Sequence, residues 1–104
     1  MKIGTTIKEL RKKKGVKQGE FADLVGISST SLSQIESNIT NPKKSTLERI
    51  CAELKIPDHL LFLLSLNEDD VPEGKKQLYD AMYPQLKEWM LNIFYEDDDK
   101  ALLD

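Results

Sequence analysis

Hydrophobic residues in the first two thirds of the chain recur at intervals of three and four, and short polar stretches separate these runs. Such spacing places the apolar side chains on one face of a helix. The polar stretches contain glycine, asparagine, serine or proline, the residues that commonly end and begin helices. The pattern therefore predicts an all-α fold, with five helices in residues 1–66 and one amphipathic helix after them.

Residues 18–36 predict two short helices joined by a tight turn. Apolar spacing from Phe21 stops at Val25, and Gly26 follows, where a residue with positive φ can close the first helix. Ser28 is expected to cap the second helix by accepting a hydrogen bond from its first turn. The outward face of this second helix would carry only small or uncharged polar residues: Ser29, Thr30, Ser31, Ser33 and Gln34.

Two further helix starts are predicted from hydroxyl and carboxylate pairs. Thr6 and Glu9 have the spacing of a capping box, as do Ser45 and Glu48, and in that motif each side chain satisfies a backbone donor of the first turn. Gly15 should end the first helix.

Charge separates the two parts of the chain. Residues 1–66 carry 11 Lys and Arg against 7 Asp and Glu, whereas residues 67–104 carry 4 against 11. A basic first part suits a nucleic-acid partner, although both parts could equally be solvated surfaces. Between them, residues 67–74 are acidic and contain proline and glycine, which is typical of a linker.

Residues 75–104 should form the C-terminal amphipathic helix, with a frayed acidic end. Pro84 is expected to kink this helix or restart it, with Tyr83 as the boundary. The apolar row favours a homodimer interface, because aromatic residues and methionine are enriched at interfaces. Folding back on the domain's own core and binding of another protein remain alternatives. The expected interface residues are Leu78, Met82, Leu86, Trp89, Met90, Ile93 and Phe94.

Composition argues against several other classes of protein. With one cysteine, Cys51, and one histidine, His59, the chain offers no disulfide and no cysteine-based metal site, and we expect neither cofactor nor enzymatic activity. The acidic run 97–99 lacks the spacing of a calcium loop. No apolar run approaches 18 residues and no secretory signal opens the chain, so a cytoplasmic protein without a membrane span is expected.

Residues 7–57 resemble the lambda-repressor-like or Cro-type (XRE) family of helix-turn-helix regulators. Family members carry an arginine in helix 1, a glutamine that opens helix 2, an alanine, a turn glycine and a small residue before helix 3. A glutamate and, six residues later, a proline follow helix 3. The matching residues here are Arg11, Gln18, Ala22, Gly26, Ser28, Glu36 and Pro42.

The resemblance implies a five-helix domain that binds double-stranded DNA with helix 3 in the major groove. It implies base-reading roles for Ser29, Thr30, Ser33 and Gln34. It implies phosphate contacts from Gln18, Asn38, Asn41, Lys43 and Lys44, and the charge of Lys17 makes it a further candidate for such a contact. Arg11 and Glu36 would form a structural ion pair between helices 1 and 3. Three departures from the family pattern are Lys17 in place of a hydroxyl cap, Gly19 within helix 2, and Asn38 in place of a glycine.

Two functional hypotheses follow. The first is a sequence-specific repressor that binds an inverted-repeat operator as a homodimer. The alternative is the antitoxin of a toxin–antitoxin pair, which would regulate its own gene through the same helices and bind its toxin through residues 67–104. The acidic charge of that segment would suit a basic partner.

Overall fold

The computed structural model describes residues 1–95, and among them it contains helices and no strand, so the predicted all-α fold is confirmed. The chain divides into two compact units, Met1–Leu66 and a second that begins at Asn67. The first contains α1 (Ile3–Lys13), α2 (Gln18–Val25), α3 (Ser29–Glu36), α4 (Lys44–Leu54) and α5 (Asp58–Leu64). The second contains the 3₁₀ turns η1 (Glu68–Asp70) and η2 (Glu73–Lys75), followed by α6 (Lys76–Phe94).

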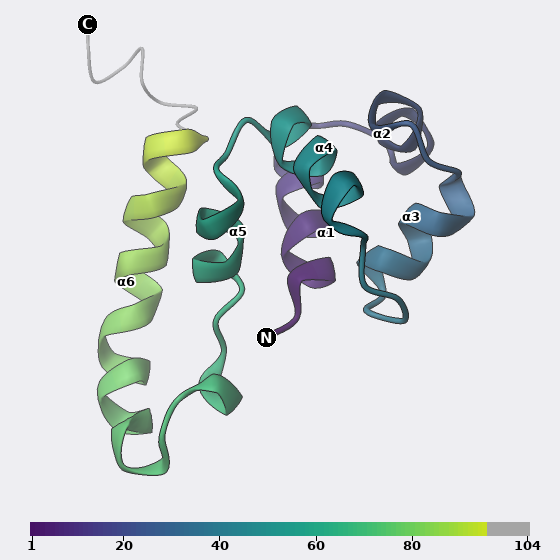
Figure 1. The fold of residues 1–104 in the computed structure, drawn as a ribbon. Coiled ribbons are helices and arrows are strands. Elements are labelled where there is room, and N and C mark those ends of the chain that lie inside the picture. The colour runs from purple at the N-terminus through teal and green to yellow at the C-terminus, as the bar shows by residue number, and fades with distance from the viewer. Residues whose placement is uncertain (96–104) are drawn as a thin grey trace, which may run out of the picture. The chain divides into compact units, whose positions relative to one another are not determined.

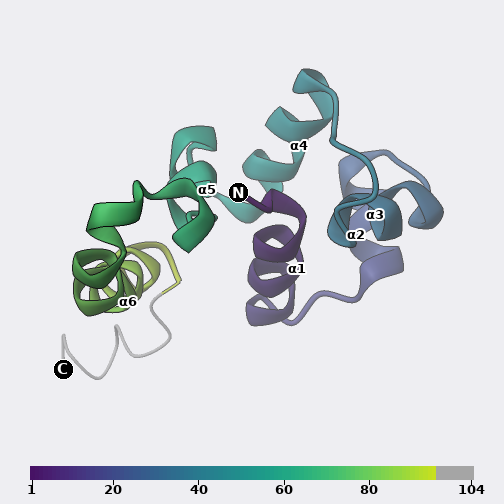
Figure 2. The same ribbon diagram turned by 90° about the horizontal axis from the view of Figure 1, so that it is seen from below.

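The first unit is organised around α1, which contacts α3, α4 and α5. Figures 1 and 2 both show α5 on one side of α1 and the α2–α3 pair on the other. All five helices contribute large side chains that are fully buried, as their three- and four-residue spacing predicts. These side chains are Ile7, Leu10, Phe21, Val25, Leu32, Ile50, Leu54, Leu61 and Leu64. Leu24 shares the spacing of its neighbours but is 54% exposed.

Both predicted capping boxes are wrong, because each helix begins before the residue that was expected to cap it. Helix α1 begins at Ile3, so Thr6 lies inside it, buried, and accepts a 2.9 Å hydrogen bond from Ser65. Helix α4 begins at Lys44, without a side-chain cap, and its buried Thr46 lies within the first turn. The start of α1 is stabilised from far along the chain, since Asn38 Oδ1 accepts the Gly4 N–H at 3.0 Å.

Positive φ values occur where the sequence predicts them at three helix ends. Gly15 has φ 73° two residues after α1, Gly26 has φ 83° after α2, and Asn38 has φ 61° two residues after α3. Glycine adopts this conformation without steric cost, and asparagine tolerates it better than most residues. Lys55 also has a positive φ, 59°, at the end of α4, and no feature of the sequence predicts it.

The second unit differs from the predicted linker and broken helix. Residues 67–74 contain η1 and η2, and both turns contact α6. Asn67 caps η1, accepting from the Asp69 N–H at 2.9 Å while its own N–H donates to Asp70 Oδ2 at 3.1 Å.

Helix α6 runs without a break for 19 residues through Pro84, so the predicted restart at Tyr83 is wrong, and a kink there stays a prediction. Proline removes one N–H donor. The donor it removes would have bonded the carbonyl of Asp80, and both residues are exposed, so water can satisfy that carbonyl. The predicted frayed end after Tyr95 lies outside the described residues. Within residues 1–95, no helix is both long and apolar enough to cross a membrane.

Candidate nucleic-acid interface

The turn between α2 and α3 sets the direction of α3. The N–H groups of Gly26 and Ile27 both donate to the carbonyl of Ala22, at 2.9 and 3.0 Å, which closes α2 with the pattern typical of a left-handed glycine. Ser28 Oγ then accepts the Ser31 N–H at 3.0 Å, the predicted cap of α3. Ala22 is fully buried, and its small side chain allows the two helices to pack closely.

Helix α3 has one buried face and one exposed face. Leu32 and Ile35 are buried against the first unit's core. The four residues proposed to read bases are all exposed and all carry polar side chains: Ser29, Thr30, Ser33 and Gln34. They can donate and accept hydrogen bonds, and none of them carries a charge.

A buried ion pair joins α1 to the end of α3. Arg11 donates to both carboxylate oxygens of Glu36, from Nε at 2.8 Å and from Nη2 at 3.1 Å. The side chains of Arg11 and Glu36 are 7% and 1% exposed. The Arg11 Nη1 also donates to the Val16 carbonyl at 2.8 Å. This bidentate geometry compensates for the removal of both charges from water and holds α3 at a defined position on α1.

Two residues of the proposed phosphate set already have partners within the domain. Gln18, the first residue of α2, donates from Nε2 to Glu36 Oε1 at 3.0 Å. Asn38 uses both ends of its amide on α1, accepting from Gly4 N–H and donating to Thr5 Oγ1 at 2.8 Å. The side chain of Asn38 therefore holds the end of α3 against the start of α1.

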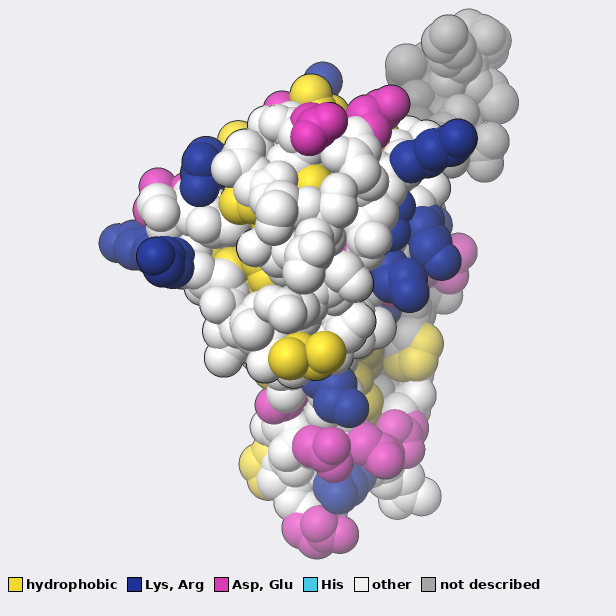
Figure 3. All heavy atoms as spheres, turned by 90° about the vertical axis from the view of Figure 1, so that its right-hand side faces the viewer, with side chains coloured by type: hydrophobic (Ala, Val, Ile, Leu, Met, Phe, Trp, Pro, Cys, Tyr) yellow, Lys and Arg dark blue, Asp and Glu magenta, His cyan; other side chains and the backbone are white. Residues whose placement is uncertain are grey.

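The other four residues of that set, Lys17, Asn41, Lys43 and Lys44, are exposed. Lys17 precedes α2, and the other three lie between α3 and the first residue of α4. Figure 3 shows the side of the first unit that carries α2 and α3: a largely uncharged surface with Lys and Arg side chains on its flanks, and some Asp and Glu side chains at its edges. Basic side chains can contact the phosphates of a nucleic acid, while the uncharged polar side chains between them can contact the edges of its bases.

One site residue went unrecognised in the sequence. Gly4 lies inside α1, and a Cβ there would overlap the backbone carbonyl of Ile35. Glycine thus permits the close approach of α1 to α3. Gly4 precedes Thr6, the predicted start of the first helix, so no local signal marked it, and its partner is 31 positions away.

The one cysteine, Cys51, is buried and is not part of this polar surface. Cys51 is buried in α4, and burial, with the nearby Asp58 carboxylate, raises the pKa of its thiol to about 11. A thiol with that pKa stays protonated near neutral pH and is a poor nucleophile. No group of three His, Cys, Asp or Glu side chains in residues 1–95 is placed to hold a metal ion.

A helical core that presents an exposed polar helix after a glycine turn, flanked by basic residues, defines a helix-turn-helix DNA-binding domain. The helix-turn-helix family model matches residues 7–61 of the chain. The chain belongs to this family, the lambda-repressor-like or Cro-type (XRE) DNA-binding transcriptional regulators.

Several relatives are transcriptional regulators by name. The chain is 42% identical over 77 residues to the HTH-type transcriptional regulator SinR of Bacillus licheniformis, a match that covers 73% of this chain and 66% of that protein. It is 39% identical over 72 residues to the ImmF control region 10 kDa protein of Bacillus phage phi105, covering 69% and 77%. It is 36% identical over 55 residues to SutR of Escherichia coli (strain K12), covering 53% and 31%. The match therefore spans just under two thirds of the first relative and under a third of SutR.

Proposed function

We propose that the protein is a sequence-specific transcriptional repressor that inserts α3 into the major groove of its operator. The observation that carries this proposal is the exposed polar face of α3, opposite the buried Leu32 and Ile35. A helix fits the major groove, where each base pair presents a distinct pattern of donors and acceptors. We propose no enzymatic role, since the relatives are regulators of transcription. A DNA target also places the protein in the cytoplasmic compartment that holds the genome.

Within α3, we assign the main base contact to Gln34. Its carboxamide can donate to and accept from the edge of one adenine, a bidentate contact that distinguishes bases well. Ser29, Thr30 and Ser33 carry hydroxyl groups, which accept from or donate to several base edges and therefore contribute less discrimination.

Phosphate contacts are assigned to the residues around α3. Lys17, Lys43 and Lys44 supply charge, and Asn41 supplies an uncharged donor from the exposed loop. Gln18 opens α2, and the backbone N–H groups of that helix start can meet phosphate. Asn38 contributes by position, because its side chain holds the end of α3 against the start of α1.

We further propose that the protein binds an inverted repeat as a homodimer through α6. The apolar row on α6 is exposed in the single chain, with Leu78 at 55%, Met82 at 61%, Trp89 at 59% and Ile93 at 73%. Exposed apolar rows of this kind usually mark a protein interface. The rest of the assigned interface is Leu86, Phe94 and the half-exposed Met90. A two-fold dimer would present both recognition helices to DNA, with half-sites about one helical turn apart.

The proposal is tested by selecting bound sequences from random double-stranded DNA with the full chain at a stated salt concentration. We expect an enriched inverted repeat with a constant distance between half-sites, because two-fold symmetry in the protein requires it in the operator. Enrichment of a single half-site would support DNA reading but contradict the dimer. An unenriched pool, with equal affinity for all sequences, would contradict the regulator itself.

The same exposed row supports a second candidate, an antitoxin that binds its toxin through residues 67–104. The net negative charge of that segment would suit a basic partner. Co-expression with the product of the neighbouring gene distinguishes the two functions. A stable heteromeric complex that dissociates when Trp89 is changed to alanine would support the antitoxin. A homodimer that ignores the second protein would support the repressor.

A further inference from the structure

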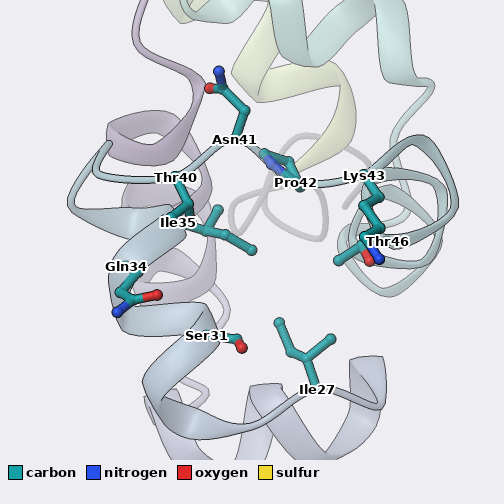
Figure 4. A pocket seen from close by; sticks show the side chains of 9 residues that line it. All are labelled: Ile27, Ser31, Gln34, Ile35, Thr40, Asn41, Pro42, Lys43 and Thr46. Atoms are coloured by element: carbon teal, nitrogen blue, oxygen red, sulfur yellow. The ribbon is translucent and has the colours of Figure 1, made fainter.

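A pocket of about 300 Å³ lies between the flank of α3 and the loop that leads to α4. Figure 4 shows Ile27, from the α2–α3 turn, and Ile35, from α3, both pointing into this space. Pro42 adds an apolar wall from the loop. Ile35 is 5% exposed and Ile27 is half-buried. Together with Pro42 they form the apolar floor of the pocket, beside the hydroxyl-bearing Thr40 and Thr46.

The rim of the pocket is polar and belongs to two different parts of the proposed DNA interface. Gln34 and Ser31 border it on the α3 side, and Asn41 and Lys43 border it on the loop side. A DNA strand whose base meets Gln34 and whose phosphates meet Lys43 would therefore pass over the mouth of the pocket.

Only one group on the base edges suits an apolar floor in this position. In the major groove the four base pairs present nitrogen and oxygen donors and acceptors, and the sole apolar group is the C5 methyl of thymine. The space is larger than a methyl group, so the pyrimidine edge that carries the methyl can enter with it.

We propose that this pocket is a thymine-methyl site that makes the protein prefer thymine at one position of each half-site. The inference rests on the proposed function, since it requires α3 to lie in the major groove. It adds a preference for thymine that the polar side chains of α3 would not produce, because those side chains bind donor and acceptor groups of the bases and not the methyl group.

The test replaces each thymine of the selected operator, one at a time, with deoxyuridine, which lacks only the methyl group. We expect affinity to fall by about fourfold at one thymine per half-site, the weight of one buried methyl group, and to stay nearly constant at the others. With the variant Ile27→Ala, thymine and deoxyuridine at that position should bind equally. Ile27→Val, which keeps most of the floor, should show an intermediate preference.

Leu24→Ala is the matched control, because it truncates an exposed aliphatic side chain on α2 that does not line the pocket. It should retain the full thymine preference. An operator that tolerates deoxyuridine at every position would overturn the methyl site while leaving the repressor function intact. Full thymine preference in folded Ile27→Ala would overturn it too. A protein that selects no DNA sequence at all would overturn both proposals.

Discussion

At the residue scale, the buried carboxylate of Glu36 connects three elements of the DNA-binding unit. It accepts two hydrogen bonds from Arg11 on α1 and one from Gln18 at the start of α2, while it lies at the end of α3. No buried side-chain nitrogen or oxygen in residues 1–95 lacks a partner. Because the bonds to Glu36 come from two other helices, the position of α3 depends on them.

Arg11→Met should reduce the free energy of unfolding by roughly 3–5 kcal/mol, because it leaves the Glu36 carboxylate buried without its cation. Urea denaturation at neutral pH measures this loss. Lys12→Met is the control: Lys12 is the exposed neighbour, and its replacement should change stability by less than about 0.5 kcal/mol. Arg11→Met combined with Glu36→Leu should recover much of the loss. Equal stability of wild type and Arg11→Met would show that the pair contributes nothing.

The same substitution at two glycines should have opposite effects. Gly4→Ala places a methyl group on the carbonyl of Ile35, so it should destabilise the domain by about 1–3 kcal/mol and displace α1 from α3. At Gly19 a Cβ would meet only Ser29 Oγ, at an ordinary 3.6 Å. Gly19→Ala should therefore stabilise the domain by about 0.4–1 kcal/mol through the unfolded chain. Thermal unfolding of both variants compares them directly, and a shift of the same sign in both would contradict this argument.

At the element scale, the proposed reading face of α3 carries small or uncharged polar side chains. Its eight residues include no lysine or arginine, so electrostatic attraction to phosphate must come from neighbouring segments. Specificity and affinity would then come from different residues, because base contacts determine which sequence is preferred and phosphate contacts supply much of the binding free energy. Variants in α3 should thus change specificity more than non-specific binding.

Gln34→Ala should weaken operator binding by about 1–3 kcal/mol and relax the preference at one base pair of each half-site. The fold should be unaffected, because Gln34 is exposed. Fluorescence anisotropy on the operator and on variants of each base pair measures the effect. Ser37→Ala, at the exposed end of α3 outside the proposed reading set, should leave the preference unchanged. An equal loss on operator and random DNA after Gln34→Ala would refute base reading by this residue.

At the scale of the whole molecule, we expect DNA affinity to depend on the proposed dimer. One reading helix without basic residues should bind a single half-site weakly, whereas two joined helices would bind both half-sites of one operator with a high effective concentration. The exposed apolar row of α6 is where we place the contact that joins two chains.

Leu86→Glu should convert the proposed dimer to monomers, because a carboxylate at the centre of an apolar interface is costly to bury. Operator affinity should then fall on the order of 100-fold through lost avidity. Gln77→Glu adds the same charge at another exposed position of α6, outside the row, and should remain dimeric. Sedimentation equilibrium of both variants distinguishes them. If Leu86→Glu still sediments as a dimer, the interface lies on another surface.

Local sequence determined much of this protein. Apolar spacing predicted the helices, Gly26 and Ser28 predicted the turn and cap before α3, and Asn38 predicted a left-handed residue. These features depend on residues a few positions apart, and propensity and hydrogen bonding act at that range. The family pattern, which also depends on spacing, was likewise readable from the residues alone.

Only the tertiary structure decided where helices α1 and α4 begin and which polar side chains form hydrogen bonds within the domain. The start of α1 depends on Asn38, and Thr6 bonds Ser65 instead of capping a helix. Continuity of α6 through Pro84 likewise had to be read from the structure. The pocket proposed for the thymine methyl group brings together Ile27, which precedes α3, and Pro42, which follows it. Such contacts pair groups far apart in sequence, and a local pattern cannot encode them because their geometry exists only after the helices have packed.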